Sequence, residues 1–228
     1  MIVESINLKV IENSIREIQD TLKADIIGNN ICRVGDSVTW NDYQTGIIKN
    51  TYYPIEYQSI IDRKQYSLLL SDLSALQFYY NFNRDGKLIS ARLALYPNPD
   101  LTLPVENVNE LQNLQYRDLM YDHMFSIMDI MSDLEARDCL FPTNTSHIRF
   151  DYDGEAKSHS TSHFQISGIN DFRIDTNFIL LPKTFLLLCE NLMDIDLSLL
   201  INLNEEHHFS DFTDKNRNKW HFRYLQSH

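Results

Sequence analysis

Three short stretches in the second half of the chain place a residue capable of acid–base chemistry or anion binding at every second position. These polar residues are His147, Arg149 and Asp151, then His163 and Gln165, then Arg173 and Asp175. Alternation of polar and apolar residues with period two is typical of a strand that buries one face. If the three strands are neighbours in one sheet, the imidazole, guanidinium and carboxylate groups gather on one face.

These side-chain types fit phosphodiester cleavage that needs no metal ion. Histidine titrates near neutral pH, so His147 and His163 are predicted to act as base and acid. Arg149 and Arg173 would hold the phosphate oxygens with rigid forks of donors, and Asp151 would orient a histidine ring. Further predicted binding residues beside them are His159, Ser162 and Gln165.

The same pattern also fits a solvated sheet face or a zinc site. Polar residues belong by default on the solvated face of a sheet, where opposite charges pair across strands. A zinc site is suggested by His159 and His163, which are four residues apart. That spacing brings ligands together on a helix, whereas extended residues four apart lie ~13 Å from each other. We therefore expect no metal at this site, and no cofactor-binding glycine pattern is present.

Periodicity predicts the elements that must position these residues. Helices are predicted from Ile11 to Leu22, from Leu119 to Leu134 and from Pro182 to Leu192, with further strands at 76–82, 87–96 and 219–224. Asp85-Gly86 between two β-rich runs indicates a hairpin. Residues 52–73 fit either a helix or an irregular packing segment.

Together these elements predict one α+β domain spanning residues 1–228. An N-terminal helical or irregular layer would cover about residues 1–75, and a sheet-rich core about residues 76–228. The expected architecture is an antiparallel sheet with the N-terminal helix and two longer helices packed on one face.

Composition limits the class of partner. The net charge is −12 and the isoelectric point about 5.0, whereas nucleic-acid surfaces need a positive footprint. An extended nucleic-acid surface is therefore disfavoured, although a small site for one phosphodiester is not. The 12 tyrosines and the acidic balance favour a protein partner. Three widely spaced cysteines, no leader-like start and no membrane-length apolar run predict a cytoplasmic protein.

The polar strands also resemble a family of bacterial proteins known only as a domain of unknown function. Its pattern of Arg-aromatic-Asp-Tyr, His-Pro-x-Ser-His-x-His, Arg-Ile-Pro and Pro-x-x-Phe is similar to segments at 149–152, 159–165, 173–175 and 182–185. Ser160 and Asp175 replace prolines of that pattern, and Gln165 replaces its second histidine. Gln165 cannot act as a general acid or base, so a site needing two histidines would use His147 or be inactive.

The resemblance implies a bacterial or phage-borne origin near defence or mobile-element genes, with no established activity. Two functions are therefore expected. The first is a bacterial effector or phage-defence-associated protein with a metal-independent, nuclease-like phosphodiesterase site for a nucleic acid or nucleotide. The second is a non-catalytic subunit that binds a protein of a bacterial defence complex through its acidic, Tyr-rich surface. Neither function involves a membrane.

Overall fold

A computed structural model describes residues 6–44, 53–99, 125, 146–156, 160–166, 173–176, 178–190, 197, 200 and 221–222. The helices with bounds in these ranges are α1 (Leu8–Thr21), α2 (Tyr53–Asp62) and α6 (Pro182–Leu188). The strands are β1 (Ile26–Asn29), β2 (Ile31–Val34), β3 (Ser37–Trp40), β4 (Leu68–Leu70), β5 (Ala75–Phe82), β6 (Leu88–Tyr96), β7 (Ile148–Asp153), β8 (Ser162–Ile166), β9 (Arg173–Thr176) and β10 (His221–Phe222). A sheet with separate helices confirms the predicted α+β class.

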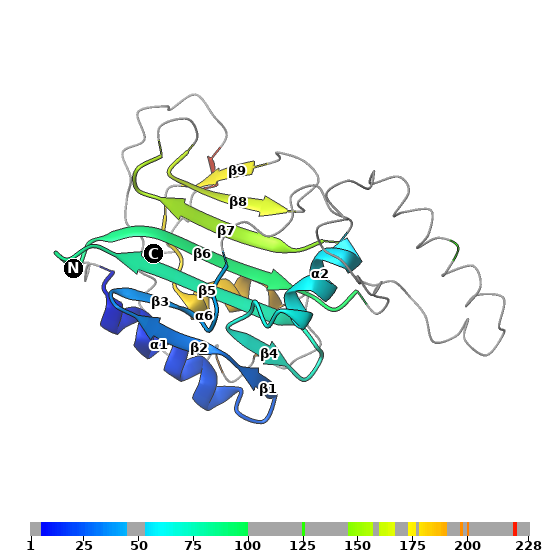
Figure 1. Ribbon diagram of the computed structural model, residues 1–228. Coiled ribbons are helices and arrows are strands. Elements are labelled where there is room, and N and C mark those ends of the chain that lie inside the picture. The colour runs from blue at the N-terminus through cyan, green and yellow to red at the C-terminus, as the bar shows by residue number, and fades with distance from the viewer. Residues whose placement is uncertain are drawn as a thin grey trace.

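The strands form one sheet in the order β1-β4-β5-β6-β7-β8-β9-β10, and the β2–β3 pair joins it through β5 (Figure 1). All the strand pairs are antiparallel except β9–β10, which is parallel. The predicted hairpin is β5–β6, and Gly86 in its turn has a φ of +75°. Glycine adopts that conformation without the steric penalty of a Cβ atom.

The three strands that carry the polar alternation are neighbours. β7 pairs with β6 on one side and with β8 on the other, and β8 pairs with β9. In this register Asp151 lies opposite both Arg92 and His163, and His163 also lies opposite Asp175. The condition on which the predicted site depends is therefore met.

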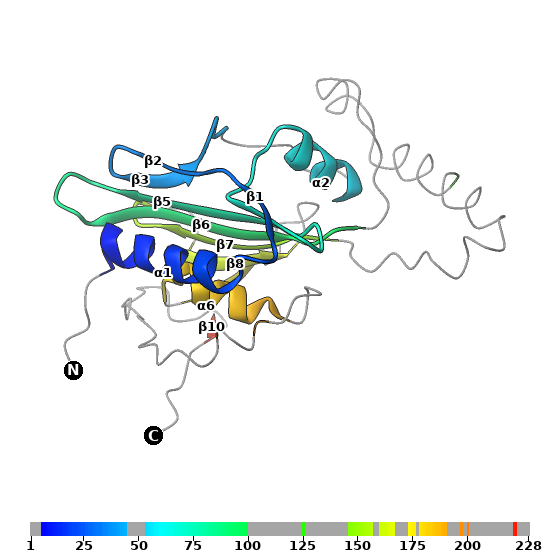
Figure 2. The same ribbon diagram turned by 90° about the horizontal axis from the view of Figure 1, so that it is seen from below.

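The apolar face of the sheet packs against α1 and α6 (Figure 2). Phe78, Leu93 and Phe150 from three adjacent strands are fully buried there with Ile11 and Ile18 of α1. The α1 helix presents its apolar residues at spacings of three and four, which gives it one buried face. Its first turn is capped by Asn7, whose side chain accepts a hydrogen bond from the backbone N–H of Val10.

Helix α2 lies on the opposite face of the sheet, above one end of β5 and β6 (Figure 2). Its residues Tyr57 and Ile60 are buried against Ala75 and Ala94. The ambiguous segment 52–73 therefore contains a helix followed by β4. The helix predicted at 119–134 lies outside the described residues except for Phe125, and no described helix is long and apolar enough to cross a membrane.

Candidate active site on the polar face of the sheet

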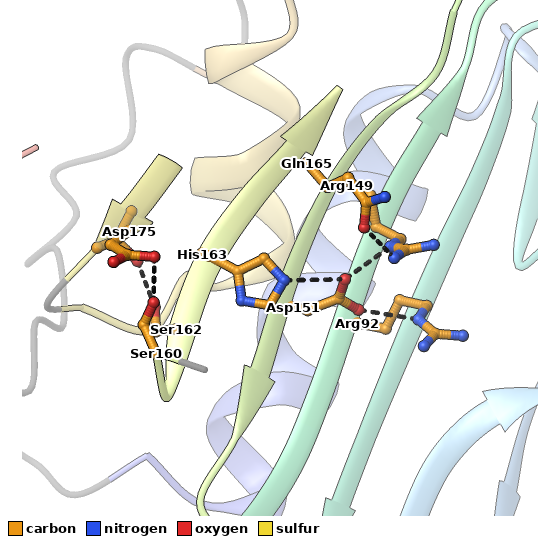
Figure 3. A network of polar contacts seen from close by, with 9 residues as sticks. Arg92, Arg149, Asp151, Ser160, Ser162, His163, Gln165 and Asp175 are labelled. Carbon is orange, nitrogen blue, oxygen red and sulfur yellow. Dashed lines mark hydrogen bonds and ion pairs between the residues drawn. The ribbon is translucent and has the colours of Figure 1, made fainter. Parts of the chain in front are cut away.

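A charged network centred on Asp151 occupies the face of the sheet opposite α1 and α6 (Figure 3). Arg92 donates from Nε to Oδ1 of Asp151 at 3.0 Å, and Arg149 donates from Nε to Oδ2 at 2.6 Å. The imidazole Nε2 of His163 lies 3.8 Å from the same Oδ2. One carboxylate thus binds or faces cationic and imidazole groups from three strands, β6, β7 and β8.

Strand geometry alone brings these side chains together. Asp151 is aligned with Arg92 on one side and with His163 on the other, and side chains directly opposite on neighbouring strands are in contact range. Arg149 lies two residues before Asp151 on β7, so both point to the same face. The period-two alternation therefore correctly placed Arg149, Asp151 and His163 on one face.

The network is largely shielded from solvent. The side chains of Asp151 and His163 are 15% and 7% exposed, whereas that of Arg92 is 35% exposed. A fully solvated sheet face is therefore excluded for the centre of the network. The alternative of cross-strand charge pairs is realised by Arg92 and Asp151, whereas Arg149 pairs with Asp151 within β7.

The charge state of Asp151 follows from two opposed effects. Burial raises the pKa of the Asp151 carboxyl, but the guanidinium groups of Arg149 and Arg92 outweigh burial and hold this pKa below its ordinary value. Burial likewise lowers the pKa of Arg92, and Asp151 more than restores it. Asp151 and Arg92 are thus both charged at neutral pH.

Gln165 and Arg173 extend the network along the next row of residues. The Gln165 side-chain oxygen accepts a hydrogen bond from Nη2 of Arg149. Arg173 lies opposite Gln165 on β9 and is exposed. In this chain the Gln165 amide therefore binds an arginine, and an amide does not act as a general acid or base.

Ser162 does not face the network. Its hydroxyl donates to the backbone oxygen of Phe178 at 2.6 Å and also bonds the hydroxyl of Thr176. The residue is fully buried on the apolar side because it is one position away from His163 on β8. Ser160 donates instead to the carboxylate of Asp175, and His159 lies outside the described residues.

His147 makes a separate pair beneath α2. Its Nδ1 lies 3.1 Å from Oε2 of Glu56, and its ring packs against Tyr96 with the ring centroids 5.1 Å apart. The His147 side chain is 1% exposed, and its Nε2 has no hydrogen-bond partner within the described ranges. The partner of His147 is therefore a carboxylate on α2. That His147 and His163 act together on one phosphate stays a prediction.

The sequence analysis missed two charged partners of the predicted residues: Arg92, which pairs with Asp151, and Glu56, which pairs with His147. Alternation along the predicted hairpin strand put Arg92 on one face with Ala94 and Tyr96, but it did not indicate which strand would lie beside that face. Nothing in the sequence indicated Glu56, because it lies in the segment 52–73, whose periodicity was ambiguous. Within the part of the chain that the structure describes, no three His, Cys, Asp or Glu residues are grouped closely enough to hold a metal ion.

Comparison with known proteins identifies a family but no activity. A family model described as "Uncharacterized conserved protein (DUF2290)" matches residues 22–223, which include all the strands of the network. No curated protein and no solved structure matches the chain. A function must therefore be inferred from the geometry of the site.

Proposed function

We propose a function for this chain from the premise that it belongs to the DUF2290 family of uncharacterized conserved proteins. The proposed activity is cleavage of a phosphodiester bond, without a metal ion, at the Asp151 network. The observation that supports it best is the shielded cluster in which Asp151 binds two arginines and faces an imidazole. Such an activity suits the bacterial defence setting that the sequence resemblance implies.

The chemistry assigns one role to each group. His163 exchanges a proton with the nucleophile or the leaving group, because imidazole titrates near neutral pH. Asp151, at 3.8 Å, stabilises the imidazolium that this exchange produces. Arg149 and Arg92 bind the phosphate oxygens, since a guanidinium carries more donors than their bonds to Asp151 and Gln165 use.

The local charge supports an anionic substrate. The three guanidinium groups of this face (Arg92, Arg149 and Arg173) outnumber its two carboxylates (Asp151 and Asp175), although the whole chain has a net charge of −12. In a partly buried site this local excess of positive charge is only weakly screened by salt. A single phosphate group therefore fits the site better than a long polyanion does.

Cleavage assays with labelled RNA and with single- and double-stranded DNA, each with and without EDTA, test this proposal. We expect cleavage that resists EDTA and falls at least a hundredfold in His163→Gln, because general acid–base catalysis contributes about 10²–10⁴-fold. We expect a comparable loss in Arg149→Met. Arg84→Met is the matched control, because Arg84 is exposed in the β5–β6 turn and its substitution removes the same charge away from the site.

Equal cleavage by wild type and His163→Gln would contradict the proposal, as would activity that EDTA abolishes. Absence of cleavage on every substrate would favour the non-catalytic binding subunit instead. In that case the protein should co-purify with a partner in a complex that high salt dissociates, since acidic surfaces bind by charge complementarity.

A further inference from the structure

A pair of stacked tyrosines lies beside the Asp151 network. Tyr79 on β5 is directly opposite Arg92 on β6 and points to the same face of the sheet. The ring of Tyr43 stacks on that of Tyr79, with the centroids 4.9 Å apart and the planes 13° from parallel. Both tyrosines are partly exposed. The polar face thus carries an aromatic surface next to Arg92.

Buried groups hold this aromatic pair in place. Trp40 is 2% exposed and contacts Tyr43 edge-on, with the ring centroids 4.9 Å apart. The side-chain oxygen of Gln65 accepts from the Trp40 indole N–H at 3.1 Å and from the backbone N–H of Gln44 at 2.9 Å. The Gln65 amide in turn donates to the backbone oxygen of Asp42. The backbone on both sides of Tyr43 is therefore fixed, and so the ring is preorganised.

The tyrosine pair and the network form one continuous row. Tyr79, Arg92, Asp151 and His163 lie opposite one another on β5, β6, β7 and β8. Neighbouring strands are about 4.8 Å apart, so the row from Tyr79 to His163 spans roughly 14 Å. The charges of Arg92 and Asp151 also reach Tyr43, whose pKa is raised by burial and is shifted in opposite directions by these two groups.

We propose that Tyr43 and Tyr79 form a base-binding platform and that the ligand of the site is a nucleotide with an unpaired base. The base stacks on the tyrosine rings, while its phosphate is bound by Arg92 and Arg149. This inference rests on the proposed phosphate-handling role of the network, and it adds the substrate class. In a nucleotide, one sugar separates the base from the phosphate. In the sheet, one strand spacing of about 4.8 Å separates Tyr79 on β5 from Arg92 on β6.

The combination of groups favours a nucleotide over other phosphate esters. Stacking on aromatic rings with an arginine nearby is the usual way in which proteins hold unpaired bases. A sugar phosphate or inorganic phosphate would use only the arginines. The net charge of −12 disfavours a long strand, which would extend beyond the few cationic groups of the site.

Calorimetric titration with adenosine 5′-monophosphate, ribose 5-phosphate and inorganic phosphate tests the platform. We expect wild type to bind the nucleotide at least fivefold more tightly than ribose 5-phosphate, because stacking of one base is worth about 1–3 kcal/mol. Tyr43→Leu should bind both compounds equally. Tyr43→Phe keeps the ring and should retain the preference, and Tyr79→Leu serves as a second variant should Tyr43→Leu not fold.

The outcomes separate the platform from the proposed catalysis. Equal binding of the nucleotide and ribose 5-phosphate by wild type would overturn the platform. Cleavage by Tyr43→Leu with a wild-type KM would also overturn it and would leave the phosphodiesterase proposal intact. Nucleotide binding that depends on Tyr43, in a protein that cleaves no substrate, would support the platform and overturn the catalytic proposal.

Discussion

Asp151 fixes two arginines from adjacent strands with a single carboxylate. Its Oδ1 binds Arg92 and its Oδ2 binds Arg149, so both guanidinium groups are held in place by the protein itself. Preorganised charges stabilise a developing charge without reorganisation at the moment of reaction. The same bonds make Asp151 the residue on which the electrostatics of the site depend.

The stability conferred by Asp151 should depend on pH in a defined direction. Its folded-state pKa lies below the ordinary value of 3.8, so its pairing stabilises the fold above that pH and loses effect as the pH falls through the folded value. Asp151→Asn should lower the free energy of unfolding by on the order of 3 kcal/mol at neutral pH. Urea denaturation at neutral pH and below pH 3.8 should show that this difference narrows in acid.

Asp151→Ala provides the comparison for that measurement, because it also removes the carboxylate but keeps no amide in its place. A difference between wild type and Asp151→Asn that stays constant with pH would mean that the carboxylate titrates equally in the folded and unfolded chain.

Cys189 should be inert in the native protein. It is 2% exposed, and burial raises the pKa of its thiol to about 12. The thiolate is the reactive form, so almost none is present at neutral pH. Mass spectrometry after iodoacetamide treatment should find Cys189 unmodified until the protein is denatured. Partly exposed Cys32 is the internal reference, and equal labelling of both in the native state would contradict this prediction.

The polar face was predictable at the residue scale wherever strand parity decided it. Alternation alone placed Arg149, Asp151 and His163 together. Ser162 was also predicted as a binding residue, although one step along a strand turns a side chain to the other face. The pairing of Asp151 with Arg92 could not be predicted, because it depends on which strand becomes the neighbour of β7, and alternation does not encode that choice.

At the element scale, a buried polar pair contributes to holding α2 on the sheet. His147, which directly precedes β7, and Glu56 of α2 are 1% and 8% exposed, and their side chains lie 3.1 Å apart. Around them, the hydroxyl of Tyr53 donates to the backbone oxygen of Pro97, and Tyr57 and Tyr96 pack in the same cluster. A buried polar group that loses its partner destabilises the fold strongly.

A double-mutant cycle at His147 and Glu56 should reveal this coupling. His147→Leu and Glu56→Leu should each lower the free energy of unfolding by about 3–5 kcal/mol, because each leaves the other partner buried alone. The double variant should be more stable than the sum of the two losses implies. Losses that add to within about 0.5 kcal/mol would show that the two side chains are energetically independent.

The position of α2 could not be predicted, because the apolar residues of this helix do not gather on a single face. Tyr53, Ile55, Glu56, Tyr57 and Ile60 are all buried, so apolar and polar residues are covered on several sides. A helix of this kind shows little periodicity. The α1 helix shows the opposite behaviour: it has one apolar face, and its existence was predicted, although it begins at Leu8 rather than Ile11 and ends at Thr21 rather than Leu22.

At the scale of the whole molecule, the charge of −12 should oppose long nucleic acids. Proteins that bind a polyanion through many cationic contacts lose affinity as salt is added. For this chain, we expect a long single strand to bind no more tightly than a dinucleotide at low salt. Fluorescence anisotropy with strands of increasing length checks this, with the Arg84→Met variant as a charge control. Affinity that rises with length and falls with salt would reveal an extended cationic surface.

The pairing of β6 with β7 joins two parts of the chain between which residues 97–147 run. The two strands of the β5–β6 hairpin are close in sequence, whereas β6 and β7 must meet across a much longer separation. Contacts between residues far apart in sequence slow folding, because the chain must lose entropy before such contacts form. The row that aligns Arg92 with Asp151 is therefore expected to form after the hairpin during folding.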